Sequence, residues 1–370
     1  MDGDHQLIVT SCGRELIRRQ CADDPALLRV LMRAGSAEPE PDILPKLEAR
    51  IEAVRQMLHS ATPGVIATLC PELLALHQLY EGDMAGRHDR HVLIHSCSWP
   101  DQQAVNLIAE WLEGLGMTVE TMRIGGLREG EKFLFKEAMA IFTRWCGNVL
   151  SNYKIYEFHI IFNPAGGSRI LVGLLQTLAP FYAHESVYLL EPGRDLVHMP
   201  MPSVQTRGDR MLRQHLHALR RLFAGLSVHP EKLAKIPEQV LMADDEGHYR
   251  LSFFGELLWD HNRRDIYGEA MLEPISDRII ITERFRDGAA ELDRGRFILL
   301  NERLDQLSFL LEAGEVNMDR TTLSLLSLRP LDAPLQESTH SCHGWADKVL
   351  WKLLGHYEGS RFVLDALVEG

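Results

Sequence analysis

The stretch YEFHIIFNPAGGS at residues 156–168 decides the fold of the N-terminal half of this chain. Its first half is rich in aromatic and β-branched residues, which is typical of a buried strand. Asn163 to Ser168 then form a turn of small residues, and a helical pattern starts at Arg169. Strands that run into helices through such turns are the repeating unit of parallel sheets, so this stretch predicts a doubly wound α/β domain.

The same pattern recurs on both sides of this stretch. A short strand is predicted at residues 7–10, where Ser11-Cys12-Gly13 ends it, and a helix follows from Arg14. Further strands are expected at 91–96, 118–124, 187–190 and 196–199, and helices at 101–115 and 131–150. The helical, Leu- and Ala-rich segment at about 39–80 is interpreted as an insertion. The sequence therefore predicts one mostly parallel sheet over residues 1–205.

Two strand ends carry groups that suit an anion. Ligands of open α/β sheets bind at the carboxyl ends of the strands. Glycines let the backbone approach a ligand closely, and a new helix offers free N–H groups. The alternative is that these turns need small residues only to close. Neither end is a GxGxxG or Walker loop, which disfavours a dinucleotide or a motor nucleotidase. The candidate ligand-binding residues are Ser11, Cys12, Gly13, Asn163, Pro164, Ala165, Gly166, Gly167 and Ser168.

Composition narrows the class of protein. The chain has 370 residues, 45% hydrophobic and 25% charged, as expected for two or three globular domains. A formal charge of −13 argues against a protein that coats nucleic acid, because that affinity comes from lysine and arginine on phosphates. The acidic N-terminus and the absence of a long apolar run predict a cytoplasmic protein with no membrane contact. The scattered cysteines contain no CxxC pair, so we expect reduced thiols and no metal.

The segments IVTSCG (8–13), FHIIFNPAGGSR (158–169) and VYLLEPGRDLVHMPMPSV (187–204) together resemble the CARF family. These are the Rossmann-like sensor domains of type III CRISPR accessory proteins. The resemblance implies a homodimer that holds a cyclic oligoadenylate at its interface, with cyclic tetra-adenylate as the expected ring. Ser168 stands where the family's turn usually has a lysine. That difference weakens a claim of ligand cleavage, though not of ligand binding.

Residues 206–275 resemble a winged helix-turn-helix domain. We expect a helix at 207–226, short helices opened by Pro230 and Pro237, two strands around the acidic turn at 245–247, and a helix after Gly255. Acidic and basic residues nearly balance here, whereas a domain that reads duplex DNA needs a basic face. We therefore favour a protein-docking or spacer role over DNA binding.

Residues 276–370 predict a small α+β unit. Strands are expected at 278–282 and 323–329, a helix at 294–313, and a hairpin of 349–354 with 361–364 that turns at 356–359. A strand, a helix and then a meander is the order of the RelE family of mRNA interferases. Residues 350–367, LWKLLGHYEGSRFVLDAL, are similar to the late hairpin of that family. The resemblance implies a metal-independent endoribonuclease that cleaves mRNA in the ribosomal A site.

Scission of RNA needs groups that move protons and groups that stabilise the phosphate. Lys352 occupies the place where the family commonly has an arginine. The chain ends at Gly370, where many relatives carry a further basic residue and a tyrosine, so the general acid and base stay open. The alternative is that the candidates are ordinary surface residues. The candidate catalytic residues are Lys352, Arg329, His343, His340, Lys348, His356 and Arg361.

Together these resemblances predict a ribosome-dependent mRNA endonuclease of type III CRISPR antiviral defence, activated by a cyclic oligoadenylate and needing no other cofactor. Two alternatives remain. One is a transcriptional regulator of the CARF and winged-helix type, which would bind duplex DNA. The other is a ring nuclease, which would degrade the cyclic oligoadenylate with the N-terminal domain alone.

Overall fold

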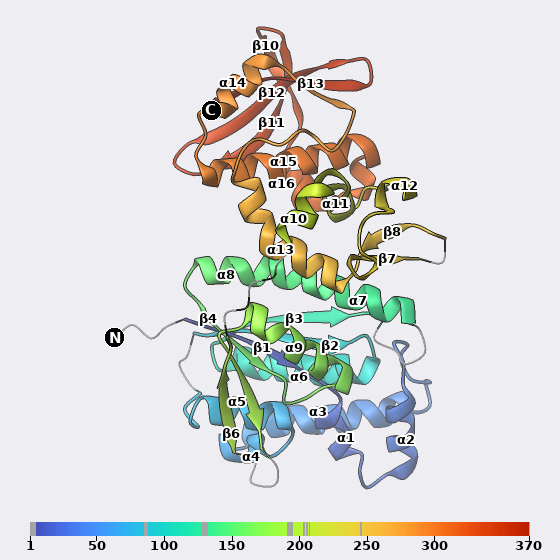
Figure 1. Cartoon of the computed structure of the whole chain (residues 1–370). Helices are drawn as coiled ribbons and strands as arrows, with labels where there is room; N and C mark the ends of the chain where they lie inside the picture. Colours follow the sequence, from blue (N-terminus) through green and yellow to red (C-terminus); the bar gives the residue numbers. More distant parts are fainter. Residues whose placement is uncertain are drawn as a thin grey trace. The chain divides into compact units, whose positions relative to one another are not determined.

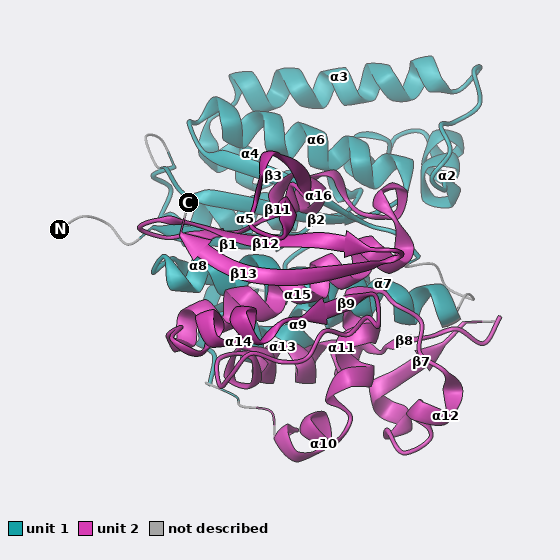
Figure 2. Ribbon diagram, turned by 90° about the horizontal axis from the view of Figure 1, so that it is seen from above, with its two compact units in different colours: residues 1–205 teal, residues 206–370 magenta. Residues whose placement is uncertain are grey.

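The computed structural model of the chain describes residues 5–84, 88–126, 132–190, 195–202, 204, 206, 208–244 and 246–369. The chain divides into two compact units, residues 1–205 and 206–370, drawn in teal and magenta in Figure 2. This division coincides with the first boundary expected from the sequence. The second expected boundary, at 275/276, lies inside unit 2. Within the described residues we find no helix with the length and apolarity that a membrane crossing requires.

Unit 1 is built on a six-stranded sheet with the order β3-β2-β1-β4-β5-β6 (Figure 1). Neighbouring strands from β3 to β5 pair in parallel, and β6 pairs with β5 in the antiparallel direction. The mostly parallel sheet predicted from the sequence is therefore present. The strands are β1 Gln6–Ser11, β2 Arg90–Ser96, β3 Thr118–Ile124, β4 His159–Asn163, β5 Glu185–Leu189 and β6 Leu196–Pro200.

Helices cover both faces of this sheet. One core cluster joins α1 to α6 with Ile8, Leu93 and Ile161, so the insertion and α6 lie on the same face. On α9 the buried leucines stand outside that cluster, while the helix contacts β1, β2, β4 and β5, so it covers the other face. The helices are α1 Glu15–Gln20, α2 Pro25–Arg33, α3 Leu44–Ser60, α4 Pro63–Ala67, α5 Pro71–Leu79, α6 Trp99–Gly114, α7 Lys132–Trp145, the π-helical turn Cys146–Leu150, α8 Ser151–Ile155 and α9 Arg169–Tyr182.

The insertion folds onto the sheet because its apolar residues recur at helical spacing. On α3 the buried stripe consists of Leu47, Ile51, Val54 and Leu58. That spacing places all four on one face of the helix, and α3 packs against α1 and α6. Pro63 and Pro71 each occupy the first turn of the following helix, where proline is tolerated because its missing N–H would be unpaired anyway. The insertion thereby ends on α5, which reaches the carboxyl ends of the strands through Glu72.

Unit 2 begins with a helical region and a two-stranded antiparallel sheet of β7 and β8. The single helix expected at 207–226 is broken at His215. Gly255 lies inside the first turn of α13 rather than before it, because Ser252 caps the helix. Glycine is needed there, since a Cβ would come within 2.2 Å of the Val240 carbonyl oxygen. The wing-tip residue Asp245 lies outside the described residues. The elements are α10 Asp209–Gln214, α11 Leu216–Ala224, α12 Pro230–Leu233, the 3-10 turn Glu238–Val240, β7 Leu241–Ala243, β8 Tyr249–Leu251 and α13 Phe253–Tyr267.

The rest of unit 2 is a five-stranded sheet with the order β10-β11-β12-β13-β9. Strands β10 to β13 form an antiparallel meander, and β9 pairs with β13 in parallel. One face packs on α15 through Cys342, Leu353 and Phe362. The elements are β9 Ile279–Ile281, α14 Glu283–Ala290, α15 Arg294–Ala313, the 3-10 turn Glu315–Asn317, α16 Arg320–Leu326, β10 Arg329–Leu335, β11 Ser338–Ala346, β12 Leu350–Glu358 and β13 Arg361–Glu369.

Three sequence predictions for this region are wrong in detail. The strand expected at 323–329 is mostly the helix α16, which Asp319 caps by accepting a hydrogen bond from the Thr322 N–H. Strand β11 was not expected, because its hydroxyl and histidine side chains hide the apolar alternation. The turn of the hairpin starts only at Gly359, because β12 continues to Glu358. The sequence had predicted a turn over residues 356–359.

A buried ion pair joins the helical region of unit 2 to α15. Arg220 on α11 donates to Asp305 on α15 with an Nη2–Oδ1 distance of 2.5 Å, and only 3% and 9% of these side chains are exposed. Tyr267 donates to the same carboxylate. The Asn301 amide also donates to the carbonyls of Tyr267 and Ala270, both at 2.8 Å. These contacts explain why residues 206–370 form one compact unit.

Replacing Arg220 by methionine should lower the free energy of unfolding of unit 2 by about 3–5 kcal/mol, because Asp305 would stay buried without its cation. Arg213→Met is the matched control. Its guanidinium pairs with Glu269 in solvent, so the loss should be below about 1 kcal/mol. Urea unfolding followed by tryptophan fluorescence measures both variants. Equal losses would contradict a structural role for the buried pair.

Candidate functional site

The carboxyl ends of β1 and β4 meet at the centre of the sheet in unit 1. The chain runs from β1 outward to β3 on one side and from β4 outward to β6 on the other, so this is the point where the strand order reverses. Ligands of open α/β sheets bind at such a point. Thr10 lies opposite Asn163 in the parallel register, and the Asn163 amide donates to the Thr10 hydroxyl at 3.4 Å. The structure thus brings together the two strand ends that the sequence selected.

The two turns after these strands pack directly on each other. A Cβ added to Gly13 would lie 2.8 Å from the Gly167 Cα atom, a distance that no side chain could occupy. Gly167 has a φ of +86°, the left-handed conformation that favours glycine. Across the same gap, the Ser11 hydroxyl donates to the Gly166 carbonyl at 2.6 Å. Glycine is therefore required on both sides by close backbone approach.

A buried carboxyl group from the insertion lies against both turns. Glu72, in the first turn of α5, accepts a hydrogen bond from the Gly13 N–H with an Oε1–N distance of 3.0 Å. A Cβ added to Gly166 would lie 2.0 Å from the carboxyl carbon of Glu72. The side chain of Glu72 is completely buried, and its Oε2 has no hydrogen-bond partner among the described residues. Sequence reasoning missed this residue, since nothing in the helical pattern of the insertion distinguishes it from a surface glutamate.

Burial controls the protonation of this site. It raises the pKa of the Glu72 carboxyl, because the charged form loses its hydration. Burial also raises the pKa of the Cys12 thiol well above its usual range, and the neighbouring Glu72 adds to the shift. A thiol in that state is neither a nucleophile nor a metal ligand at neutral pH. Cys12 is therefore a structural group here.

The candidate ligand residues differ in their access to solvent. Ser11, Cys12 and Asn163 are fully buried, and Gly13, Pro164 and Gly166 are also buried. Ala165 and Gly167 are partly exposed. Ser168 is exposed and caps α9, since its hydroxyl accepts from the Leu171 N–H at 3.3 Å. A ligand at this edge would meet Ala165, Gly167 and Ser168 first. Their role in binding stays a prediction.

Substitution of Gly13 tests the close approach of the two turns. Gly13→Ala should lower the melting temperature by several degrees, because its Cβ would collide with the Gly167 backbone. The matched control is Gly173→Ala within α9, where an added Cβ meets no atom within 4 Å. Alanine favours a helix over glycine by about 1 kcal/mol, so the control should be neutral or stabilising. Thermal unfolding measures both, and a neutral Gly13→Ala variant would contradict the packing.

A second group of polar residues lies on the sheet of unit 2. His343 on β11 pairs directly with Lys352 on β12, and Arg329 pairs with Ser341 in the adjacent row. Cys342 and Leu353 pair between these rows and point into the core with α15. Because side chains alternate along a strand, Arg329, His343 and Lys352 share the opposite face. We name this surface the outer face of the sheet.

The outer face also carries a histidine held by a buried aspartate. His356 Nδ1 lies 2.9 Å from Asp365 Oδ2, and the Ser338 hydroxyl donates to the same oxygen at 2.8 Å. This contact with Asp365 raises the pKa of His356, since the carboxylate favours the imidazolium. Asp365 Oδ1 is buried and has no hydrogen-bond partner in the part of the chain that the structure describes. Sequence reasoning included His356 but missed Ser338 and Asp365.

The other candidates lie elsewhere. His340 pairs with Gly355 on the α15 side of the sheet, where its ring meets Tyr357 and Phe362 edge to face. Lys348 lies exposed in the turn between β11 and β12. Arg361 pairs with Glu358 at the hairpin end, about 20 Å along β12 from Lys352. Among the described residues, no group of three His, Cys, Asp or Glu side chains is placed to hold a metal.

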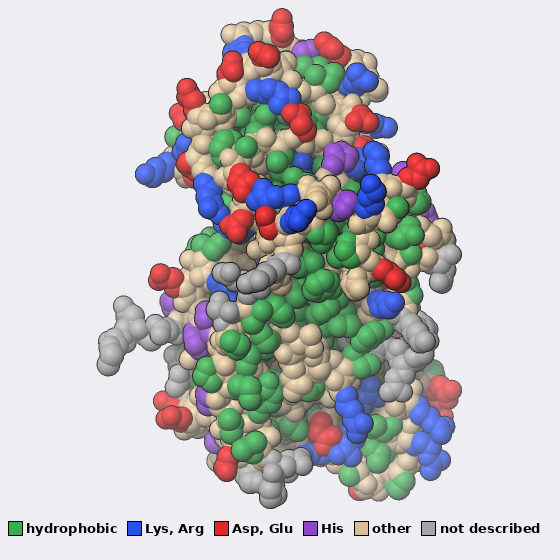
Figure 3. Space-filling model, viewed as in Figure 1, with side chains coloured by type: hydrophobic (Ala, Val, Ile, Leu, Met, Phe, Trp, Pro, Cys, Tyr) green, Lys and Arg blue, Asp and Glu red, His purple; other side chains and the backbone are tan. Residues whose placement is uncertain are grey.

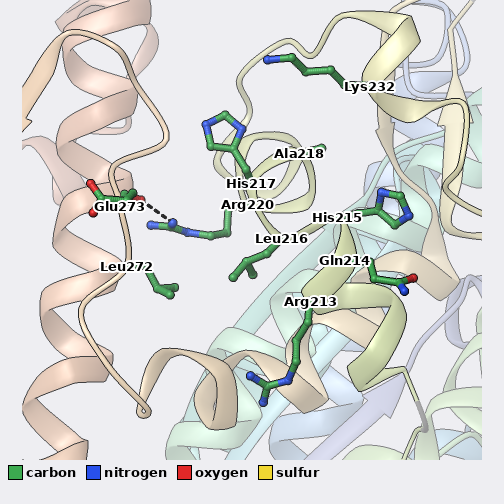
Figure 4. A pocket seen from close by; sticks show the side chains of 10 residues that line it. All are labelled: Arg213, Gln214, His215, Leu216, His217, Ala218, Arg220, Lys232, Leu272 and Glu273. Carbon is green, nitrogen blue, oxygen red and sulfur yellow. Dashed lines mark hydrogen bonds between the residues drawn. The ribbon is translucent and has the colours of Figure 1, made fainter.

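A cavity of about 620 Å³ lies in the helical region of unit 2, between α10, α11 and the segment after α13 (Figure 4). Figure 3 shows basic and histidine side chains gathered over α11 and α12 beside acidic ones. Arg220 reaches across the cavity to the Glu273 carbonyl at 2.7 Å, while Arg213 pairs with Glu269. With these arginines already paired, the other polar groups that line the cavity include Gln214, His215, His217 and Lys232.

Comparison with known families concerns unit 1. Residues 67–202 match the family model described as CRISPR-associated protein (Cas_APE2256). The matched segment includes Glu72 and the turn at 163–168, but neither Ser11 nor any residue of unit 2. This similarity supports an association of the chain with CRISPR systems. No curated protein matches the chain.

Proposed function

We propose that the chain is a signal-activated endoribonuclease of CRISPR defence, in which unit 1 binds a cyclic oligoadenylate and unit 2 cleaves mRNA on the ribosome. The observation that carries the proposal is the outer face of the sheet in unit 2. Arg329, His343 and Lys352 lie in two adjacent rows there, and His356 stands on the same face with Asp365 behind it. Cations beside an oriented histidine are the groups that RNA scission needs.

The chemistry divides between these residues. The 2′-hydroxyl loses its proton to a base and its oxygen attacks phosphorus, while the bond to the 5′-oxygen breaks and that oxygen takes a proton from an acid. Lys352, with His343 directly opposite, stabilises the charge that builds up on the phosphate. His356 is the acid, because Asp365 fixes its ring and favours its protonated form.

Distances along the strand allow this division. Lys352 and His356 are four residues apart on β12, which corresponds to about 13 Å between their backbones. Both side chains project from the same face and extend toward a strand of RNA lying on it. Arg361 is too far along the hairpin to join them, and His340 belongs to the other face.

The signal is assigned to unit 1 for two reasons. The similarity to a CRISPR-associated family covers β2 to β6, including the turn at 163–168. The switch point between β1 and β4 also offers the N-terminus of α9, which suits a phosphate group. We propose a homodimer as the binding form, because a ring with twofold character fits an isologous interface. The compartment proposed is the cytoplasm.

Substitutions on the outer face test the catalytic assignment. Lys352→Ala should slow cleavage by about a hundredfold to a thousandfold, because one stabilising cation is lost. His356→Ala should slow it by at least about a hundredfold, because the acid is lost. Arg284→Ala, on the exposed surface of α14, is the charge-matched control and should cleave like the parent.

The measurement is primer extension on mRNA from translating ribosomes, with and without cyclic tetra-adenylate. Cleavage by the parent that depends on this ligand supports the whole proposal. Parent-like cleavage by both Lys352→Ala and His356→Ala would place the active site elsewhere. Absence of cleavage by the parent under both conditions would overturn the nuclease assignment.

The pH dependence of cleavage should report His356. Its pKa is raised by the hydrogen bond that its ring donates to Asp365, so the acid form persists above the ordinary value of about 6.5. The rate should therefore fall only as the pH rises through that raised pKa. Asp365→Asn removes the negative charge and should move this fall to lower pH, whereas His343→Ala should leave its position unchanged. The measurement is a profile of kcat/KM against pH for the parent, Asp365→Asn and His343→Ala. If the rate of Asp365→Asn falls at the same pH as that of the parent, His356 is not the acid.

A further inference from the structure

The carboxyl group of Glu72 fills a space built for an anion. It accepts the Gly13 N–H at 3.0 Å and lies against Gly166, where a Cβ would come within 2.0 Å of its carboxyl carbon. Gly13 and Gly166 follow β1 and β4, at the point where the strand order reverses. We name this space, between the turns 11–13 and 163–168, the cradle.

Among the described residues, no cation compensates Glu72. The thiols of Cys12 and Cys70 and the carboxylate of Glu15 influence its carboxyl, and of these only the Cys70 thiol lowers its pKa, as the Gly13 N–H does. Burial outweighs these neutral donors and raises the pKa, and Oε2 has no hydrogen-bond partner among the described residues. Packing alone would be served better by an apolar side chain of similar size. The cradle therefore holds a carboxyl group whose burial is only partly compensated.

We propose that the Glu72 carboxyl occupies the position of one phosphate group of the ligand, and that binding displaces it together with the first turn of α5. Carboxylates and phosphates accept hydrogen bonds from the same backbone N–H groups. When Glu72 leaves, the Gly13 N–H and the space beside Gly166 become free for a phosphate oxygen. The proposal rests on the proposed function, which supplies a cyclic oligoadenylate as the ligand. The resting protein is thus closed by its own side chain.

Displacement of Glu72 is coupled to pH. Burial raises its pKa in the closed cradle, and in water the pKa returns to about 4.3. Between these two values, displacement releases a proton, so ligand affinity rises with pH across that window. The other groups that face Glu72 do not titrate there. Burial holds the pKa of both thiols well above the usual range, and a hydrogen bond from Arg18 lowers the pKa of Glu15.

The direct test is Glu72→Ala in the full-length protein. A ligand that must first open the cradle binds more weakly by the fraction of molecules that are open. Calorimetry with cyclic tetra-adenylate should therefore show at least about tenfold tighter binding for Glu72→Ala than for the parent. Glu48→Ala, on the exposed surface of α3, is the matched control. It removes a carboxylate from the same insertion without loosening α5 or emptying the cradle, so its affinity should stay near that of the parent.

A second variant keeps the shape of the side chain. Glu72→Gln cannot ionise, so its affinity for cyclic tetra-adenylate should be independent of pH between about 5 and 8, whereas that of the parent should rise. Because this substitution is isosteric, it also answers the case in which Glu72→Ala fails to fold. Equal pH profiles for the parent and Glu72→Gln would overturn the displacement.

Measurements with inorganic phosphate distinguish a failure of the proposed displacement from a failure of the ligand assignment. If cyclic tetra-adenylate binds no variant, but phosphate raises the melting temperature of Glu72→Ala more than that of Glu48→Ala, the cradle stands and the ligand assignment fails. If cyclic tetra-adenylate binds the parent and Glu72→Ala equally, the ligand assignment stands and the displacement is wrong. If neither anion distinguishes Glu72→Ala from Glu48→Ala, the displacement is also wrong.

Discussion

The parallel pairing of β1 with β4 is the interaction on which unit 1 depends. It lies at the centre of the sheet, and the chain proceeds from it outward in both directions. The pairing sets Thr10 beside Asn163 and thereby forces the two following turns into contact. That contact is tolerated only because Gly13 and Gly167 lack side chains. The candidate ligand site is a consequence of this one pairing, since each group in it is positioned by one of the two strand ends or, for Glu72, by packing against them.

How far the sequence predicts the structure depends on how local the signal is. The central strands β1, β2 and β4 are buried on both faces, so they read as continuous apolar runs. The edge strands β3 and β6 are largely exposed, but the turns and helices around them still placed them, and all six strands were located. Helix α15 was located to the residue, because Asp293 caps its start and Gly314 follows its end. Glu72 could not be found, because its burial depends on where α5 docks and not on its neighbours in sequence. Its partner Gly13 is distant in the chain, and only the folded sheet brings the two together.

Prediction from the sequence was limited in the same way for the outer face of the sheet in unit 2. Lys352 was selected because it occupies the place where the resembling family commonly has an arginine. In the structure it lies on β12 with Trp351 and Leu353 buried on either side. His343 was a candidate, but its position opposite Lys352 depends on the register of β11, a strand that the sequence did not reveal. Asp365 was missed for a different reason. The register of β12 and β13 shifts between Leu354 and Gly355, which leaves Asp365 outside the regular pairing and beside His356. A bulge of this kind re-aims one side chain and has no reliable signature in a single sequence.

Two buried carboxyl groups take opposite roles because of their partners. Glu72 has no cation beside it, so burial raises its pKa and favours the neutral form in the closed cradle. Asp365 has His356, whose pKa rises because the carboxylate stabilises the imidazolium. On the proposed function, a fall in pH favours the closed cradle of unit 1, while a rise in pH deprotonates the proposed acid of unit 2. The proposed binding and the proposed cleavage are then both favoured above the range in which Glu72 titrates and below the pKa of His356. The response of the whole protein to pH is then bounded on its two sides by groups in different units, so each side can be moved by substitution in one unit without altering the other.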